Sequence, residues 1–555
     1  MLENAQNRIG RTFFSGVLLL TLSTISVKAI GLFYKIPMLS YLGAEGMGYF
    51  NSAYEIYALF CVIATAGLPV ALSVLISAAM ANREEERAER IYRLALRIFL
   101  GIGILGSMLM VLLARRFCGW IKNENAYLCM LSISPTVFLI CLASALRGYF
   151  QGHQRMLPTA LSQLLEAIGK LGFGLLLARW ALAKGYDTPA VAAFAGLGLT
   201  LGEVLSVLYL LLEKLRFQEK RGRVDRRERS KSADRYVLRD LARLSLPMTL
   251  GASLVSLTKL IDMTMILRRL QSIGYSEALA NEAYGSYTTL ALSLYGLLPS
   301  LINSVSIPLV PILSAAISSG DLPRQQQMVK LSYRLTAFFA IPASLGLSAF
   351  AGPVLSLLFG KDPTSVSLAA PLLSYLGASV FLSCMITATN SVLHAYREVN
   401  KPILSMVLGS AVKIVTAYLF IGNPTFALAG APISTFFCNL AVVLLNWRFS
   451  AGLCQTPSVF RLFGRPLLAS ALSVGAAYGI FRLLSQQMGE GGIITLAALG
   501  LAVLLYIFLS CLLGALTWED VLLLPGGERI AQILCRLRLL PSKGKDVLSG
   551  KETNL

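Results

Sequence analysis

The sequence predicts an all-α, polytopic membrane protein of about fourteen transmembrane helices, with two parallel six-helix lobes and two extra C-terminal helices. Three observations lead to this fold class. First, 55% of the 555 residues are apolar and only 14% are charged, a balance that excludes an ordinary soluble protein. Second, apolar runs long enough to cross a bilayer, about 20 residues each, follow one another between short polar breaks. Third, the first half of the chain is repeated in the second.

Each apolar run is predicted as one membrane-spanning helix. The runs lack the ten-residue alternation of a membrane β-barrel, and backbone exposed to lipid must satisfy its own hydrogen bonds. The first run is too long for the core of a cleavable signal peptide, so we expect it to be the first span. The predicted spans are 13–39, 47–79, 91–114, 125–147, 157–181, 188–212, 244–267, 284–316, 331–359, 368–395, 401–422, 425–447, 464–485 and 494–516.

Lysine and arginine concentrate in alternate loops, and this predicts the orientation. The chain has 49 Lys and Arg against 29 Asp and Glu, a formal net charge of +20, and basic residues collect in the cytoplasmic loops of membrane proteins. We therefore expect a cytoplasmic (inner) membrane protein with both termini in the cytoplasm and no nucleic-acid partner. Basic residues are frequent at 8–11, 83–90, 155, 213–243, 324–330, 397 and 448–465, and sparse at 115–122, 184, 268–269 and 361.

An internal repeat predicts the lobes. GLPVALSVLISAA at 67–79 resembles SIPLVPILSAA at 306–316, and Lys170 matches Lys413 at an offset of 243 residues. Because each copy holds six spans, both copies enter the membrane the same way and form two parallel lobes with the substrate path between them. Spans 13 and 14 have no repeat partner.

The predicted domains follow from this repeat. The basic segment between the copies is expected to be a cytoplasmic linker on anionic lipid, with a specific cytoplasmic partner as the alternative. Apolar residues at helical spacing near 530–540, interleaved with arginines, predict an amphipathic helix on the inner surface. The division is 1–212 for the N-lobe, 213–243 for the linker, 244–448 for the C-lobe, 464–516 for spans 13 and 14, and 517–555 for the cytoplasmic tail.

Charged residues at bilayer depth are few, and each predicts a cavity or a partner, because an isolated charge there costs at least about 2.5–3.5 kcal/mol. Lys28 and Lys35 are seven residues apart on the first span and share one helix face. Alignment of the repeats places Lys28 opposite Lys259, and such lysines suit a phosphate or pyrophosphate group. In the alternative interpretation, Glu55 pairs with Lys28 or Lys35. Lys259 then pairs with Asp262, and Lys35 extends to the outer interface.

The remaining polar groups of the spans are assigned as follows. Glu166 and Lys170 stand in the favourable i, i+4 order, and we expect a structural pair. Glu203 has no partner near it in sequence, so it either carries protons or completes a buried hydrogen bond. Glu55 and Asp262 are further candidates for ion coupling. The nine cysteines show no C-x-x-C spacing and are expected to be buried apolar residues, with neither a metal site nor a cofactor.

The motifs of known catalytic sites are missing. The sequence contains no G-x-x-x-x-G-K-[ST], H-E-x-x-H or G-x-S-x-G motif and only two histidines. We therefore expect a transporter driven by a gradient, the membrane potential or a partner, and not an enzyme. An intramembrane transferase is disfavoured because the outer loops are short.

Four segments resemble a known family. They are similar to the polysaccharide transporter branch of the multidrug/oligosaccharidyl-lipid/polysaccharide (MOP) exporters, and most of all to stage V sporulation protein B-like proteins, which are relatives of MurJ-type lipid II flippases. The segments are SVKAIGLFYKIPMLSYLGAEGMGYFNSAYEIY at 26–57, AGLPVALSVLISA at 66–78, LRGYFQGHQRMLPTALSQLLEAIGKLG at 146–172 and LHAYREVNKPILSMVLGSAVKIV at 393–415.

The resemblance implies a MATE-like fold and a flippase that moves an undecaprenyl-diphosphate-linked oligosaccharide, such as the peptidoglycan precursor lipid II, by alternating access. It implies that Lys28 and Lys35 face a central cavity, and that spans 13 and 14 flank a groove for the lipid tail. Cell-wall synthesis proteins become candidate partners. The basic residue that MurJ-type proteins carry in the second helix has no counterpart here, where Glu55 stands among apolar residues.

A MATE-type drug/cation antiporter of the same superfamily is the alternative. Glu55, Asp262 and Glu203 favour it, because such antiporters couple transport to Na⁺ or H⁺ through a membrane carboxylate. Two lysines on the first span disfavour a cationic cargo electrostatically.

Overall fold

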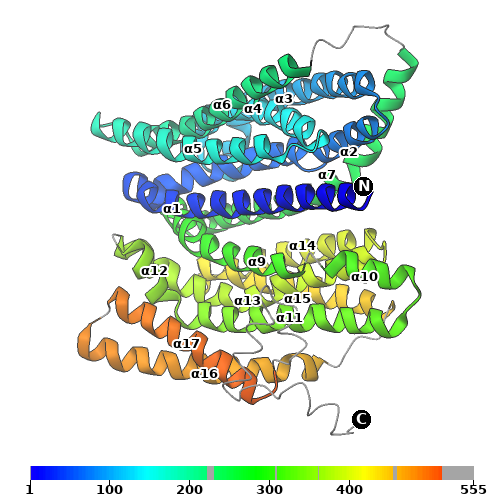
Figure 1. Cartoon of the computed structure of the whole chain (residues 1–555). Coiled ribbons are helices and arrows are strands. Elements are labelled where there is room, and N and C mark those ends of the chain that lie inside the picture. The colour runs from blue at the N-terminus through cyan, green and yellow to red at the C-terminus, as the bar shows by residue number, and fades with distance from the viewer. Residues whose placement is uncertain are drawn as a thin grey trace, which may run out of the picture. The chain divides into compact units, whose positions relative to one another are not determined.

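A computed structural model of the chain describes residues 2–221, 231–306, 309–360, 362–453, 459–489 and 491–515. Within these ranges all regular structure is helical, so the predicted all-α class is confirmed. Figure 1 shows the helices, which are α1 (Leu2–Thr65), α2 (Leu68–Ala81), α3 (Glu85–Ile121), α4 (Tyr127–Gly152), α5 (Met156–Ala183), α6 (Thr188–Arg221), α7 (Lys231–Ser272), α8 (Glu277–Ser286), α9 (Leu292–Ser306), α10 (Leu309–Ser318), α11 (Leu322–Ala349), α12 (Ala351–Phe359), α13 (Pro363–Ala395), α14 (Asn400–Ile421), α15 (Gly430–Ala451), α16 (Val459–Met488) and α17 (Gly492–Leu512).

Three short helical segments join these helices. They are the 3-10 helices η1 (Glu124–Ala126) and η3 (Ala427–Ala429), and the π-helical stretch η2 (Tyr287–Ala291), which connects α8 to α9. A π-helical turn widens the helix locally and is found mostly as a single insertion.

Two compact units make up the chain, residues 1–289 and 290–555. The boundary falls within η2, whereas the predicted lobes divide at the basic linker. The difference arises because α7, the first helix of the second repeat, packs against α1, α2 and α3 inside the first unit. The lobe boundaries follow from the sequence repeat and stay a prediction.

The helices are long and apolar enough for a multi-pass membrane protein. Eleven of those described meet this condition, or up to twelve when the pair α11 and α12, bent by 75°, counts as one span. The predicted total of fourteen is not confirmed. Two predicted spans, 13–39 and 47–79, overlap a single candidate segment, Ser23–Ala81. The predicted span 284–316 is divided among α8, η2, α9 and α10.

The first segment is broken at two places. Gly43 has φ 66° and ψ 177° inside α1, a conformation that glycine adopts without steric cost. A second break at residues 66–67 precedes α2, which has a proline in its first turn, where a missing N–H costs nothing. A Cβ atom on Gly67 would lie 2.2 Å from the carbonyl oxygen of Ser245 on α7, so the break also permits close packing.

The order of helices supports the internal repeat. The short helix α2 begins at Leu68 and is followed by the long α3, and the short α10 begins at Leu309 and is followed by the long α11. Later helices recur at a similar spacing, with α5 beginning at Met156 and α14 at Asn400. The separations are close to the offset of 243 residues between Lys170 and Lys413.

The additional C-terminal helices α16 and α17 pack on each other and on α11 in the second unit. The Tyr506 hydroxyl of α17 donates a hydrogen bond to the carbonyl oxygen of Phe338 on α11 at 2.7 Å. Six of the seven described cysteines are buried and Cys61 is half-buried, which agrees with their predicted role as apolar residues.

The linker and tail are described in part. In the predicted linker 213–243, the flanking residues continue α6 to Arg221 and begin α7 at Lys231. Residues 222–230 and the tail from 516 on, with its predicted amphipathic helix, lie outside the described residues.

Candidate functional site

A group of charged residues gathers in the first unit where α5 and α7 pack against α1. Lys35 and Glu55 both belong to α1, and their charges interact. In a straight helix twenty residues span about 30 Å. Their interaction therefore requires the chain to fold back between them, and the break at Gly43 provides that reversal.

Helix α7 adds a lysine and a carboxylate to this group. The charges of Lys259 and Asp262 both interact with that of Glu55, and Lys259 also interacts with Lys35. Lys259 is exposed and Glu55 is half-buried. The structure thus brings together Lys35 of the first repeat and Lys259 of the second, with Glu55 near both.

Lys28 is exposed on α1, seven residues or two helical turns before Lys35. The alignment of the repeats predicts that it lies opposite Lys259. The charge of Lys35 interacts with that of Lys259, so Lys35 is the lysine of α1 that this site includes.

The Lys35 ammonium group is held by a hydrogen bond. Its Nζ donates to the carbonyl oxygen of Thr288 at 3.4 Å, and the Thr288 hydroxyl accepts a bond from Asn51 Nδ2 at 2.8 Å. Thr288 lies in η2. The lysine is therefore linked to the π-helical turn at the end of the first unit.

Lys170 of α5 extends the group, and it lies over aromatic rings. Its Nζ is 4.8 Å from the ring centroid of Tyr54 and 5.5 Å from that of Tyr34, both on α1, at distances typical of cation–π contacts. In the second unit the matching Lys413 is buried and interacts with Tyr295. Both matching lysines therefore lie near a tyrosine.

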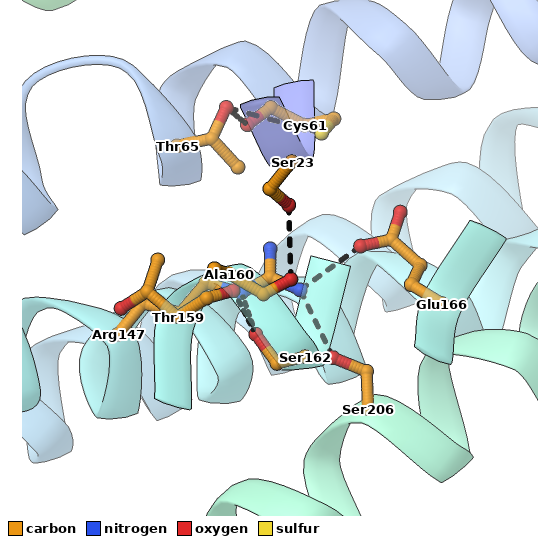
Figure 2. Close-up of polar contacts among 9 residues, drawn as sticks. All are labelled: Ser23, Cys61, Thr65, Arg147, Thr159, Ala160, Ser162, Glu166 and Ser206. Atoms are coloured by element: carbon orange, nitrogen blue, oxygen red, sulfur yellow. Dashed lines mark hydrogen bonds and ion pairs between the residues drawn. The ribbon is translucent and has the colours of Figure 1, made fainter. Parts of the chain in front are cut away.

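Next to Lys170 lies a buried ion pair that joins α4 to α5 and α6. Arg147 is 8% exposed, and its Nη2 donates to Glu166 Oε2 at 2.9 Å and to Ser206 Oγ at 2.9 Å. Its Nε donates to Ser162 Oγ at 3.0 Å. Figure 2 shows the guanidinium group between these three side chains. Such a fork of donors satisfies a buried carboxylate better than an ammonium group does.

Glu166 has two cationic neighbours in this arrangement. Its ion pair is with Arg147 of α4, and its charge also attracts that of Lys170. The structural pairing of Glu166 with Lys170 stays a prediction, and the direct contact is with the guanidinium group of another helix.

Glu203 of α6 lies beside this ion pair. It is 1% exposed, and its Oε1 has no hydrogen-bond partner among the described residues. Its charge interacts with those of Glu166 and Arg147. The two carboxyl groups and the guanidinium group therefore form one cluster, which we call the Arg147 cluster (Arg147, Glu166, Glu203).

A polar contact, which we call the outer contact, joins residues 44–52 and 123–125 to residues 277–289 within the first unit. Asn123 and Asn281, both fully buried, exchange amide hydrogen bonds of 2.8 and 3.2 Å. Asn123 also donates to Ser52 at 3.0 Å. These residues lie toward the predicted outer side, and they connect the first repeat to the second.

The backbones approach closely at the outer contact. A Cβ atom on Gly48 would lie 2.3 Å from the carbonyl oxygen of Asn281, and one on Gly285 would lie 1.9 Å from that of Ala44. Only glycine fits at such positions. The contact is therefore tight packing reinforced by buried amides.

Sequence reasoning missed Arg147 and the amide network for different reasons. The predicted span 125–147 ends at Arg147, which places it at the membrane edge, but α4 continues to Gly152. The buried asparagines have partners as far as 158 residues away, so no local pattern indicates them. The GLPV repeat and the lysine match were the available signals, and neither involves these residues.

The chain is similar to known proteins over much of its length. A family described as polysaccharide biosynthesis protein matches residues 13–317, more than half of the chain. The lipid II flippase MurJ of Bacillus subtilis is 24% identical over 72% of this chain and 76% of its own length. The stage V sporulation protein B of the same organism is 24% identical over 79% of this chain and 83% of its own length.

Solved structures share the fold. A lipid II flippase MurJ in an inward closed conformation has a TM-score of 0.65 at 15% identity and covers 89% of this chain and 98% of its own. An inward-facing multidrug resistance MATE family transporter of the MOP superfamily has a TM-score of 0.58 at 15% identity and covers 80% of this chain and all of its own. The similar proteins are transporters and flippases, not catalysts. The chain is thus a multi-pass membrane protein that belongs to the polysaccharide biosynthesis protein family, in the polysaccharide transporter branch of the MOP superfamily.

Proposed function

We propose that the chain is a flippase for an undecaprenyl-diphosphate-linked oligosaccharide, with lipid II as the first substrate to test. Both curated relatives named above support this class, one of them by its name. The proposal includes a location in the cytoplasmic membrane with both termini in the cytoplasm, and the division into lobes 1–212 and 244–448.

The observation that carries the proposal is the meeting of Lys35 and Lys259 at Glu55. Together with Lys170 the group holds three lysines against two carboxylates, Glu55 and Asp262, and its formal charge is positive. A diphosphate brings several acceptor oxygens and negative charge, and lysines bind phosphate as point charges. We assign Glu55 as the internal anion that the diphosphate displaces.

Lys28 serves as the entrance in this account. Its exposed ammonium group lies two turns before Lys35 on the same helix face. The diphosphate first meets Lys28 and then moves along α1 to Lys35 and Lys259. The prenyl chain stays in lipid throughout.

The outer contact supplies the closed side of an alternating-access cycle. It joins residues of both repeats through the Asn123–Asn281 pair and the glycine approach at Gly48 and Gly285. When the outer contact opens and the inner side closes, the diphosphate is released outside. Lys35 is hydrogen-bonded to Thr288, which belongs to this contact, so substrate binding and opening are linked through η2.

Binding by purified protein tests the proposal. Lipid II or undecaprenyl diphosphate is titrated into detergent-solubilised protein, and bound lipid is counted by native mass spectrometry. We expect Lys35→Gln and Lys259→Gln each to weaken binding about tenfold or more, the factor that corresponds to 1.4 kcal/mol. Lys184→Gln is the control, because Lys184 is exposed at the end of α5.

The outcomes separate substrate from site. Binding that persists unchanged in both lysine variants contradicts the assigned site. Absence of binding by correctly folded wild-type protein contradicts the diphosphate-linked substrate class.

A cation antiporter of MATE type is the second candidate, and one observation favours it. The Oε2 atom of Glu55 is buried and has no hydrogen-bond partner among the described residues, as expected of a carboxylate that receives an ion. Drug efflux by cells that express the protein, lost in Glu55→Gln and retained in Lys35→Gln, would establish this function in place of the flippase.

A further inference from the structure

Lys170 of α5 contacts α1 on both sides of the break in that helix. Its Nζ lies 5.5 Å from the ring centroid of Tyr34 and 4.8 Å from that of Tyr54. Tyr34 directly precedes Lys35 in the chain, and Tyr54 directly precedes Glu55. These contacts therefore bring the ammonium group and the two rings to the edge of the proposed diphosphate site.

The two rings differ in how accessible they are. Tyr34 is 3% exposed, and a Cβ atom on Gly174 of α5 would lie 2.9 Å from its hydroxyl oxygen. This ring is therefore packed between α1 and α5. Tyr54 is half-buried, so it is the ring of the two that a ligand can reach.

Neighbouring aromatic side chains of α1 hold the Tyr54 ring in place. The Phe50 ring lies nearly parallel to it at a centroid distance of 6.3 Å, and the Tyr57 ring is tilted against it at 5.6 Å. Both neighbours are buried. A flat surface that is already ordered loses little conformational freedom when a ligand binds to it.

The Lys170 ammonium group gains from leaving the ring when a diphosphate arrives. A cation over an aromatic face is held less strongly than one that donates a hydrogen bond to a charged phosphate oxygen. A lysine has a flexible four-carbon stem that permits such a movement. A diphosphate bound at Lys35, whose charge already interacts with that of Lys170, therefore draws the ammonium group away from the Tyr54 ring.

The chemistry of the cargo places a sugar next to that ring. In a diphosphate-linked oligosaccharide the first sugar is bonded directly to the second phosphate, so it lies within one sugar ring of the diphosphate. A pyranose has a C–H face as well as hydroxyl groups, and an aromatic ring offers that face a large apolar surface. The Tyr54 ring stands at this distance from the lysine that binds the phosphate.

We propose that the Tyr54 ring is the platform for the first sugar of the cargo, and that Lys170 covers this ring until the diphosphate draws its ammonium group away. The inference rests on the proposed function and adds a sugar subsite to it. Because bare undecaprenyl diphosphate uses the lysines but not the ring, the platform makes the chain prefer the sugar-bearing lipid.

The test compares two ligands that differ only in their sugars and peptide. Lipid II and undecaprenyl diphosphate compete for purified protein, and each complex is counted by native mass spectrometry. Tyr54→Met replaces the ring by a flexible apolar chain. We expect it to reduce the preference for lipid II about tenfold and to leave the affinity for undecaprenyl diphosphate unchanged.

Three further variants assign the effect. Tyr54→Phe keeps the flat ring and should retain the preference. Tyr375→Met is the matched control, because Tyr375 is a tyrosine of α13 with 51% exposure, and it should behave as wild type. Lys170→Gln removes a cation from the diphosphate and should weaken both ligands. Wild-type affinity for undecaprenyl diphosphate in Lys170→Gln overturns the role of Lys170, and equal losses of both ligands in Tyr54→Met overturn the platform.

A fluorescence measurement carries the test if Tyr54→Met does not fold. Tyr54→Trp keeps an aromatic platform and is made in a background whose four native tryptophans are replaced by phenylalanine. A sugar that covers the indole ring excludes water from it, so lipid II is expected to shift the emission to shorter wavelength than undecaprenyl diphosphate does. Identical emission with the two bound ligands overturns the platform.

The wild-type result separates this inference from the proposed function. If wild type binds both ligands equally well and Tyr54→Met changes neither, the sugar platform fails and the diphosphate site stands. If well-folded wild type binds neither ligand, the proposed function fails and the platform fails with it.

Discussion

At the scale of single residues, long-range partners decide how each intramembrane charge is neutralised. Glu166 has a lysine one turn away in sequence, yet its ion pair is with Arg147 of another helix at 2.9 Å. Arg147 donates to two serines as well. A buried arginine that satisfies three partners makes the α4–α5–α6 packing depend on one side chain.

Replacing Arg147 is expected to destabilise the first unit strongly. Arg147→Met leaves Glu166 without its cation, and breaking a buried pair costs about 3–5 kcal/mol. Thermal unfolding in detergent measures the loss. Arg155→Met is the control, because the Arg155–Glu213 pair is more exposed, with 40% of the arginine side chain accessible, and such pairs contribute about 0–1 kcal/mol. Equal losses in the two variants would contradict the structural role given to Arg147.

Glu55 is expected to weaken anion binding in the wild type. Glu55→Gln removes the internal anion that interacts with Lys35 and Lys259, so both lysines become available to the diphosphate. We expect roughly tenfold tighter binding of undecaprenyl diphosphate, equivalent to about 1.4 kcal/mol, measured by native mass spectrometry. Weaker binding in Glu55→Gln would show that the carboxylate supports the site and does not compete for it.

At the scale of helices, the break at Gly43 and the approach of α8 to α1 shape the first unit. The break folds α1 back so that Lys35 and Glu55 interact, and the second half of α1 then packs against α8. Two glycines, Gly48 and Gly285, bring the backbones into contact. Helices this close separate as rigid bodies when a side chain is inserted between them.

A methyl group at Gly285 is expected to open the outer contact. Gly285→Ala places Cβ 1.9 Å from the Ala44 carbonyl oxygen, whereas Gly251→Ala on α7 meets nothing within 4 Å and serves as the control. Opening is measured by labelling Thr288→Cys with a membrane-impermeant thiol reagent added outside. Faster labelling in Gly285→Ala alone is expected, and equal labelling in both variants would contradict the gate.

At the scale of the whole molecule, the sequence predicts the class and order of the helices better than their number or contacts. Apolar runs of membrane length predict helices correctly because the bilayer itself dictates their length. The count of fourteen is not confirmed. Some predicted spans are divided into several helices, and others are joined in one long candidate segment, as in Ser23–Ala81. Charge at bilayer depth makes Lys35 and Lys259 candidates, and their place in the site stays a prediction, whereas Arg147 and the Asn123–Asn281 pair depend on tertiary contacts that no local pattern records.

Locking the outer contact is expected to stop transport by the whole molecule. A short, cleavable thiol cross-linker is applied to the double variant Asn125→Cys and Glu277→Cys in a background whose native cysteines are replaced by alanine. Cross-linked protein should not move lipid in proteoliposomes, and cleavage of the linker should restore movement. Each single-cysteine variant, treated in the same way, controls for modification alone. Undiminished transport by the cross-linked protein would contradict a cycle in which this contact opens.

The most direct measurement is lipid II translocation in cells that are depleted of their own flippase and express this chain. Accessibility of lipid II in the outer leaflet is scored for wild type, Lys35→Gln, Lys259→Gln and the Lys184→Gln control, with membrane insertion verified for each. The account predicts translocation by wild type and by the control, and its loss in the Lys35 and Lys259 variants. Full translocation by both of these variants, or none by well-inserted wild type, would contradict it.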